Sequence, residues 1–172
     1  DGSYFLPFQV AGDARVKKAS VRMDHGGFYR EFEVGKDAAV FGFSGSGELD
    51  VPVVFAGYGI TDPQRDYDDY AGLDVAGKAV LVLPREQGAR FSAHAHFTTK
   101  AMNARKHGAV AMIVVTDPVH HAGDEDLMPF GGGADDLGVI ALHARQSLVQ
   151  GLFRLAGRDL TQVQREIDQD LK

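Results

Sequence analysis

The side chains best suited to metal chemistry in this 172-residue sequence are histidines and nearby carboxylates, grouped in two places. They are His94, His96, His120, His121, Asp124, Glu125 and Asp126. Imidazole nitrogens and carboxylate oxygens are the donors that zinc and related divalent ions prefer. The sequence alone does not bring the two groups together, and it lacks the His-Glu-x-x-His spacing of a helical zinc site. A metal site and a solvated, donor-rich loop both remain open, and the solvated loop is favoured.

An acidic group before the middle of the chain has the residue types of a calcium site. Its members are Asp62, Asp66, Asp68, Asp69 and Asp74. They lack the regular alternation and the closing glutamate of a calcium-binding loop. Aspartate side chains also accept hydrogen bonds from backbone amides in turns, and this role is the interpretation that we favour.

Several glycine-rich stretches begin like nucleotide-binding or catalytic motifs, namely residues 42–46, 45–47, 57–59 and 72–78. Residues 72–78 have the spacing of a phosphate-binding loop, but Ala79 follows where a Ser or Thr should bind magnesium. They also precede an apolar run instead of following one, so a turn at Gly77 and Lys78 is expected. The two Gly-x-Gly stretches lack the third glycine of a dinucleotide fingerprint. Ser44 lacks the final glycine of a nucleophile elbow and is expected in a flexible loop.

Composition limits the class of protein. The net charge of -6 and pI near 5.6 argue against a nucleic-acid partner. The basic residues Lys100, Arg105, Lys106 and His107 are expected on a solvated helix face. The sequence has no cysteine, which excludes disulfides and thiolate metal sites, and no run of eighteen apolar residues, so no membrane span is expected.

The elements that must position these side chains follow from the apolar pattern. Residues 4–10, 19–23 and 29–34 are expected to form strands of an antiparallel meander. The nearly continuous apolar runs 51–58, 79–83 and 109–116 indicate strands buried on both faces.

Helical spacing predicts one helix near residues 97–107 and two more near the end of the chain. The first is capped by Thr98 or Thr99 and stopped by Gly108, which makes residues 79–116 a right-handed strand-helix-strand unit. A parallel strand at 139–142 precedes a helix that ends at Gly157, and a capping box at Thr161 and Gln164 begins the last helix. Residues 117–138 form the long loop. The result is a layered α/β domain whose mixed sheet has a parallel centre, antiparallel companion strands and helices on one side.

These residues, read in order, resemble the protease-associated (PA) domain that is inserted in zinc aminopeptidases of the transferrin receptor/glutamate carboxypeptidase-like superfamily. The stretch Val-Val-Phe-Ala-Gly-Tyr-Gly-Ile at 53–60 carries the resemblance, followed by Tyr-Asp-Asp-Tyr at 67–70 and Asp-Val-Ala-Gly-Lys at 74–78. Residues 100–111 resemble the PA helix and its following strand. The resemblance covers nearly the whole chain and implies a three-layer β/β/α swivelling fold, a single PA domain over 1–172. Residues 1–50 would be antiparallel strands and entry, 51–145 the core, and 146–172 the C-terminal helices and exit.

The resemblance also implies a function. A PA domain covers or shapes the active-site cleft of its parent enzyme, whose catalytic domain holds two zinc ions through a His-x-Asp motif and a Glu-Glu pair. Neither motif occurs here, so no catalytic, cofactor-binding or metal-binding residue is assigned to this chain. The expected partners are the catalytic peptidase domain of the same parent chain and peptide or protein substrates, in the periplasm or outside the cell. The alternatives are a free-standing peptide- or protein-binding PA module and a metal-dependent hydrolase built on His94, His96, His120 and His121.

Overall fold

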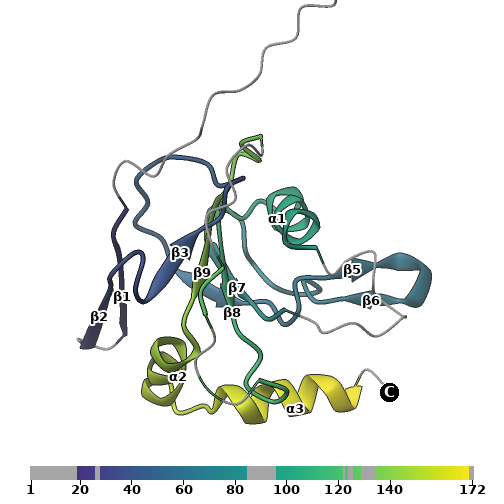
Figure 1. Ribbon diagram of the computed structural model, residues 1–172. Helices are drawn as coiled ribbons and strands as arrows, with labels where there is room; N and C mark the ends of the chain where they lie inside the picture. The colour runs from purple at the N-terminus through teal and green to yellow at the C-terminus, as the bar shows by residue number, and fades with distance from the viewer. Residues whose placement is uncertain are drawn as a thin grey trace, which may run out of the picture.

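A computed structural model describes residues 19–25, 28–84, 96–121, 123, 126–128 and 135–170. Within these residues the centre is a five-stranded mixed sheet with the order β3-β9-β8-β7-β4 (Figure 1). Its strands are β3 (Ala38–Val40), β4 (Val53–Phe55), β7 (Ala79–Val82), β8 (Ala111–Val115) and β9 (Ile140–Ala144). β4, β7, β8 and β9 run parallel, and β3 pairs antiparallel with β9. The predicted α/β class with a mixed, centrally parallel sheet is therefore confirmed.

The strand-helix-strand unit is present as expected, with helix α1 (Phe97–Lys106) between β7 and β8. Every residue of β7 and β8 is buried, which is why their sequences are continuously apolar. Gly108 has φ +88° and lies close enough to Ala76 that an added Cβ would stand 3.3 Å from its Cα. The predicted threonine cap is wrong, because the helix begins at Phe97 and its N-cap His96 makes no side-chain cap bond.

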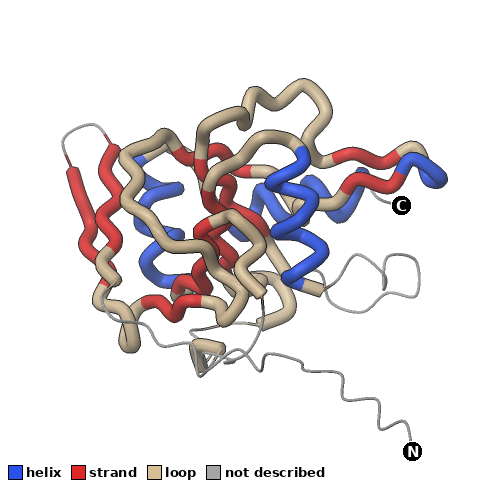
Figure 2. The backbone as a smooth tube through the Cα atoms, turned by 90° about the horizontal axis from the view of Figure 1, so that it is seen from above, coloured by secondary structure: helices blue, strands red, loops and turns tan. Residues whose placement is uncertain are grey.

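Helices cover both faces of the sheet, and the expectation that they lie on one side is wrong. Alternate residues of a strand point to opposite faces, so each buried strand needs two apolar partners. Val80, Val82 and Val114 pack with Ala101 and Ala104 of α1. Figure 2 shows strands running through the middle of the molecule with helices to either side.

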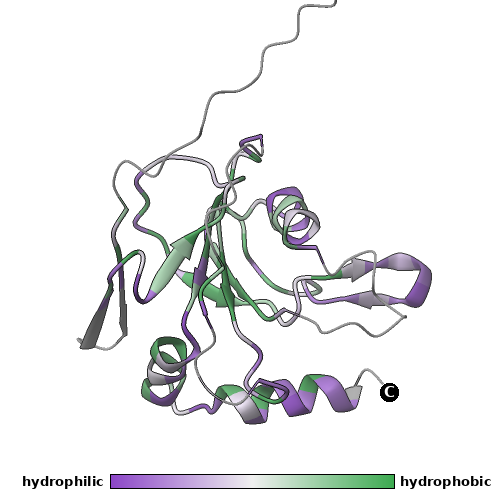
Figure 3. Ribbon diagram, in the orientation of Figure 1, coloured by the Kyte–Doolittle hydropathy of each residue, from purple (hydrophilic) through white to green (hydrophobic). Residues whose placement is uncertain are grey.

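The second face is covered by α2 (Gln146–Leu155) and α3 (Leu160–Asp170). There Leu81, Ile113 and Val115 belong to one cluster with Val149 of α2 and Leu160 of α3. Figure 3 shows the same division, with hydrophobic colour along the central strands and hydrophilic colour on the outer parts of α3. The end of α2 agrees with the sequence prediction, whereas the start of α3 does not. Gly157 ends α2 at φ +70° as expected, but Asp159, not Thr161, caps α3 by accepting from the amide of Gln162 at 2.9 Å.

The amino-terminal strands do not form a continuous meander. β1 (Val21–His25) and β2 (Phe28–Phe32) pair antiparallel in a separate two-stranded sheet, close to the expected ranges. β3 leaves them and joins β9, with Ala38 fully buried against that strand's end. The outer edge of a parallel strand has unpaired backbone groups, and β3 satisfies those of β9. The strand predicted at residues 4–10 lies outside the described residues.

A small hairpin projects from the sheet after β4 (Figures 1 and 2). It consists of β5 (Thr61–Asp62), the 3₁₀ turn η1 (Pro63–Arg65) and β6 (Tyr67–Asp68). Asp62 caps η1 by accepting from the amide of Gln64 at 3.2 Å, and Asp66 adopts a left-handed conformation at φ 53°. The turn interpretation of the acidic group is thus confirmed for these residues. No helix in the described parts of the chain has the length and apolar character that a bilayer crossing requires.

Candidate functional site

The stretch Gly57 to Ile60 wraps around the carboxylate of Asp69. One oxygen of Asp69 accepts from the amide of Tyr58 at 3.1 Å and from that of Ile60 at 2.9 Å. The hydroxyl of Tyr67 donates to the other oxygen. Burial raises the pKa of Asp69, although these hydrogen bonds and the charge of Lys100 act in the opposite direction. We call Gly57 to Ile60, Asp69 and Lys100 the Asp69 anchor.

Two glycines allow the backbone to approach this closely. Gly57 has φ +50°, and a Cβ there would stand 2.4 Å from the Asp69 carboxylate. Gly59 has φ +66°, and its Cβ would meet Val82 at 2.9 Å. Both positions therefore need glycine, because the backbone is left-handed there and a Cβ would collide with Asp69 or Val82. Nucleotide binding is not needed to explain the Gly-Tyr-Gly sequence.

Lys100 completes the anchor from α1, and its expected place on a solvated helix face is wrong. Its side chain is 1% exposed. The ammonium donates to the carbonyl oxygen of Tyr58 and, at 3.3 Å, to that of Leu83. It thereby supplies hydrogen bonds to buried carbonyl groups from two segments far from α1 in the chain.

The remaining basic residues of α1 differ among themselves. Arg105 donates to the carbonyl of Leu137 at 3.0 Å, and Lys106 is exposed as expected. His107 stacks on Tyr70 with ring centroids 4.3 Å apart and planes inclined by 5°. Only part of the predicted solvated face is therefore solvated.

A second polar group gathers where β8 and β9 end, and we call it the carboxyl-edge cluster: Thr116, Asp117, His120, His143 and Gln164. The carboxyl ends of parallel strands are where α/β proteins commonly place binding groups. Thr116 and Asp117 follow β8 directly and point to opposite faces of the sheet. Thr116 meets His143 of β9, and Asp117 lies on the side covered by α3.

Asp117 and His120 form a close acid-imidazole pair. The Asp117 side chain is 1% exposed and its carboxylate lies 2.7 Å from Nδ1 of His120, whose side chain is 51% exposed. Its other oxygen accepts from the amides of Val119 at 2.8 Å and His120 at 3.0 Å. Burial opposes the charged form, but the hydrogen bonds from His120, Gln164 and Val119 hold the pKa of Asp117 below its usual range. An ionised carboxylate only accepts, so the His120 proton sits on Nδ1.

His143 is 4% exposed and has a defined tautomer. The amide of Met128 donates to its Nδ1 at 3.2 Å, so that nitrogen must carry a lone pair. Nε2 then carries the proton and donates to the hydroxyl of Thr116 at 3.1 Å. Burial, followed by the charge of Arg145, lowers the pKa of His143.

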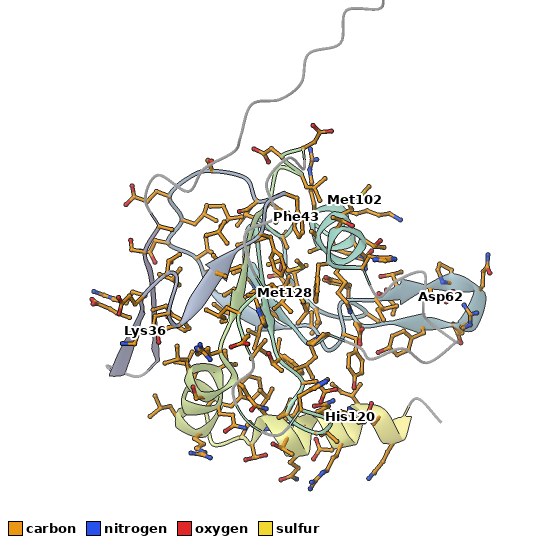
Figure 4. The ribbon with its side chains drawn as sticks, in the orientation of Figure 1. Lys36, Phe43, Asp62, Met102, His120 and Met128 are labelled. Carbon is orange, nitrogen blue, oxygen red and sulfur yellow. The ribbon has the colours of Figure 1, made fainter. Side chains whose placement is uncertain are left out.

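The helix α3 is fastened to this edge by polar contacts as well as by its apolar face. Gln164, fully buried, accepts from the amide of Val119 at 3.3 Å and donates to the Tyr58 hydroxyl at 3.4 Å. That hydroxyl donates in turn to Asp168 at 2.6 Å, and burial together with this contact raises the pKa of Tyr58. Tyr58 thus connects the two polar groups of the domain. Figure 4 shows His120 beside α3.

The proposed metal donors do not converge within the described residues. There, no group of three His, Cys, Asp or Glu side chains is placed to hold a metal ion. His96 is exposed at the start of α1, while His120 and His121 lie in the turn that follows β8. His94, Asp124 and Glu125 lie outside the described residues. Asp126 is exposed.

The glycine-rich stretches resolve into turns. Lys78 donates to the backbone and side chain of Asp74, both at 2.9 Å, and Gly77 has φ +69° just before β7, as expected for a turn. Ser44 is not in a loose loop: its hydroxyl donates to the Gly45 carbonyl at 2.9 Å and accepts from the Ala141 amide at 2.8 Å. A hydroxyl used in this way fastens the chain to β9.

Sequence reasoning missed Lys100, His143 and Gln164 as buried polar residues. A signal existed for Lys100, which lies at i+3 from Phe97 and one residue before Ala101, on the apolar face of its helix. His143 stands inside an apolar strand, where a buried partner could have been expected. Gln164 was assigned to a helix cap.

Comparison with known proteins adds one family match. A family model described as a PA domain matches residues 46–149, which is more than half of the chain. No curated protein matches. Among solved structures, an aminopeptidase from Aneurinibacillus sp. strain AM-1 aligns with a TM-score of 0.49 and 26% identity over 68% of this chain. The chain spans about a quarter of that structure, 24% of its length.

Proposed function

This chain belongs to the PA domain family, and from that premise we propose that it is the non-catalytic, protease-associated module of a secreted or periplasmic zinc aminopeptidase. In that role it acts as a lid or interaction surface over the active site of a catalytic domain in the same parent chain. The zinc and the hydrolytic residues belong to that catalytic domain.

The observation that carries this proposal is what four residues in the stretches that resemble the family do in the structure. Gly57, Gly59, Asp69 and Lys100 hold one another and the backbone of this domain. Catalytic groups must reach a substrate, whereas these hydrogen bonds end on the domain's own amides and carbonyls. Residues that bind only their own backbone stabilise the fold of the domain. A stable, non-catalytic domain beside a peptidase can shape the active-site cleft and contact the substrate.

The first experiment measures hydrolysis by the isolated chain. Purified protein is incubated with zinc and aminoacyl chromogenic substrates, and no turnover above a buffer control is expected. Turnover that survives repurification and scales with the chain would refute the non-catalytic role.

A metal-dependent hydrolase is the rival function that one observation favours. Histidines that bind metals commonly donate their other ring N–H to a carboxylate, as His120 does to Asp117. The variants His120→Ala and Asp117→Asn distinguish the two. If the rival is correct, any zinc-dependent activity disappears in His120→Ala and falls by about 10–100-fold in Asp117→Asn.

A free-standing peptide-binding module is the second alternative. The coding sequence on both sides of residues 1–172 separates it from an inserted domain. Zinc-ligand motifs such as His-x-Asp and Glu-Glu on the flanks are expected for the insert. Flanks without them would favour the free-standing module, and cell fractionation would then test the periplasmic or extracellular location separately.

A further inference from the structure

The contact between His143 and Met128 depends on the protonation state of one ring. A backbone amide can only donate, so it binds Nδ1 of His143 only while that nitrogen is unprotonated. A second proton on the ring would place an N–H against the Met128 N–H at the same position. The contact would then change from attractive to repulsive.

Among the residues that the structure describes, the groups that contact the ring offer no negative charge to compensate a positive one. Thr116 of β8, the Phe41 ring at 6.4 Å and Met128 are uncharged. Arg145, just after β9, is the charged group acting on the ring in the described part of the chain, and it repels a second positive charge. Protonation therefore requires the ring to lose its present partners or to reach water.

We propose that His143 is an acid-sensitive clasp that holds Met128, in the described residues 126–128, against β9 and releases its backbone amide when the imidazole takes up a proton. Residues 126–128 stand in the chain between β8 and β9. The clasp goes beyond a role beside a peptidase and does not depend on it, because it is built wholly from this chain.

The direction of the pH effect follows from linkage. Burial lowers the pKa of His143 in the folded domain from the ordinary 6.5. The released state binds the proton more readily than the closed state, so closure is most stable above that value and weakens as pH falls below it. The clasp is closed at neutral pH.

Amide hydrogen exchange of Met128, measured by NMR on the whole chain, tests the clasp. Its protection factor, corrected for intrinsic exchange, should fall about tenfold between pH 7.5 and pH 5.5, because a released ring with an ordinary pKa is mostly protonated at the lower pH. The amide of Ala56, which binds the backbone carbonyl of Leu81 at 2.9 Å and so has no titrating acceptor, is the internal reference and should change less than about twofold.

A matched variant separates protonation from packing. His143→Asn places an amide oxygen near the position of Nδ1, so it can still accept from Met128 but cannot titrate. Its Met128 protection should be independent of pH over the same range. In the unmodified chain, ¹⁵N shifts of the ring should show an unprotonated Nδ1 at pH 7.5, a measurement that needs no variant.

Four results would overturn the clasp. Two are a protonated Nδ1 at pH 7.5 and Met128 protection that is constant down to pH 5.5. The third is an equal fall at Ala56, which would indicate loosening of the whole domain, and the fourth is an equal fall in His143→Asn.

Discussion

The Asp69 anchor and the carboxyl-edge cluster are both polar groups inside an apolar domain, but they are held by different kinds of charge. The anchor pairs an aspartate with backbone amides and a lysine with backbone carbonyls. The carboxyl-edge cluster depends on two histidines, whose ordinary range lies near neutrality. The stretches that carry the family resemblance thus fasten the backbone of the domain to itself, and the two histidines lie at the carboxyl edge of the sheet, also within the matched residues 46–149.

Removing the carboxylate of the anchor should have the largest effect on stability. Asp69→Ala leaves the amides of Tyr58 and Ile60 without their acceptor and Lys100 without a neighbouring negative charge. We expect a loss of about 3 kcal/mol in the free energy of unfolding, measured by urea denaturation. Asp74→Ala removes an exposed carboxylate bound to Lys78 and should leave the denaturation midpoint unchanged. Similar losses in the two variants would show that the anchor is no stronger than a surface pair.

A glycine exchange measures how tightly the backbone wraps around Asp69. Gly57→Ala should destabilise the domain by about 2 kcal/mol more than Gly72→Ala. Both positions have positive φ, but a Cβ at Gly72 meets nothing within 4 Å, whereas one at Gly57 meets Asp69 at 2.4 Å. Equal effects, again by urea denaturation, would mean that only backbone strain matters at Gly57.

The two aspartates should give pH profiles of opposite sign. The native pKa of Asp117 is lowered, so its contribution is complete above the ordinary value of 3.8 and is lost as pH falls below it. Asp117→Asn should therefore cost about 1 kcal/mol at pH 7 and less at pH 3. Burial raises the pKa of Asp69, so the cost of Asp69→Asn should grow as pH falls towards 3.8. Unfolding measured at several pH values would contradict the contrast if both costs changed in the same direction.

The smallest effect is expected at a tyrosine that borders the anchor. The hydroxyl of Tyr70 is buried and has no hydrogen-bond partner, whereas that of Tyr58 binds Asp168 and Gln164. Tyr70→Phe should be neutral or stabilise by up to about 1 kcal/mol, and Tyr58→Phe should destabilise by about 1 kcal/mol. Thermal unfolding measures both changes in stability. If Tyr70→Phe were the more destabilising of the two, the unpaired hydroxyl would belong to Tyr58 and not to Tyr70.

Local patterns predicted the parallel core well, because β7 and β8 are continuously apolar and Gly108 is a strong helix stop. They could not predict that β3 pairs with β9, since that pairing joins residues far apart in the chain and depends on which strand edge is left open. They also assigned helices to one face, although strands buried on both faces require cover on both. That requirement was already implicit in the apolar runs.

The polar groups were harder to predict than the fold. The turn roles of Asp62 and Asp66 follow from local chemistry and were expected. Lys100 was expected on the surface because lysine is rarely buried, and here only the carbonyls of two distant segments make its burial favourable. Asp117 and His120 are three residues apart, yet their pairing depends on the turn after β8 and on Gln164 from α3.

The pairing of β3 with β9 also affects how the domain forms during synthesis. When β8 leaves the ribosome, β7 is already available to pair with one of its edges. Its other neighbour, β9, is synthesised later. The strand β3 is synthesised first, but it cannot pair until β9 has been made. An apolar edge of the nascent sheet is therefore uncovered until nearly the whole domain has been translated. The amino-terminal strands can pair early as a hairpin, while the central layer closes last.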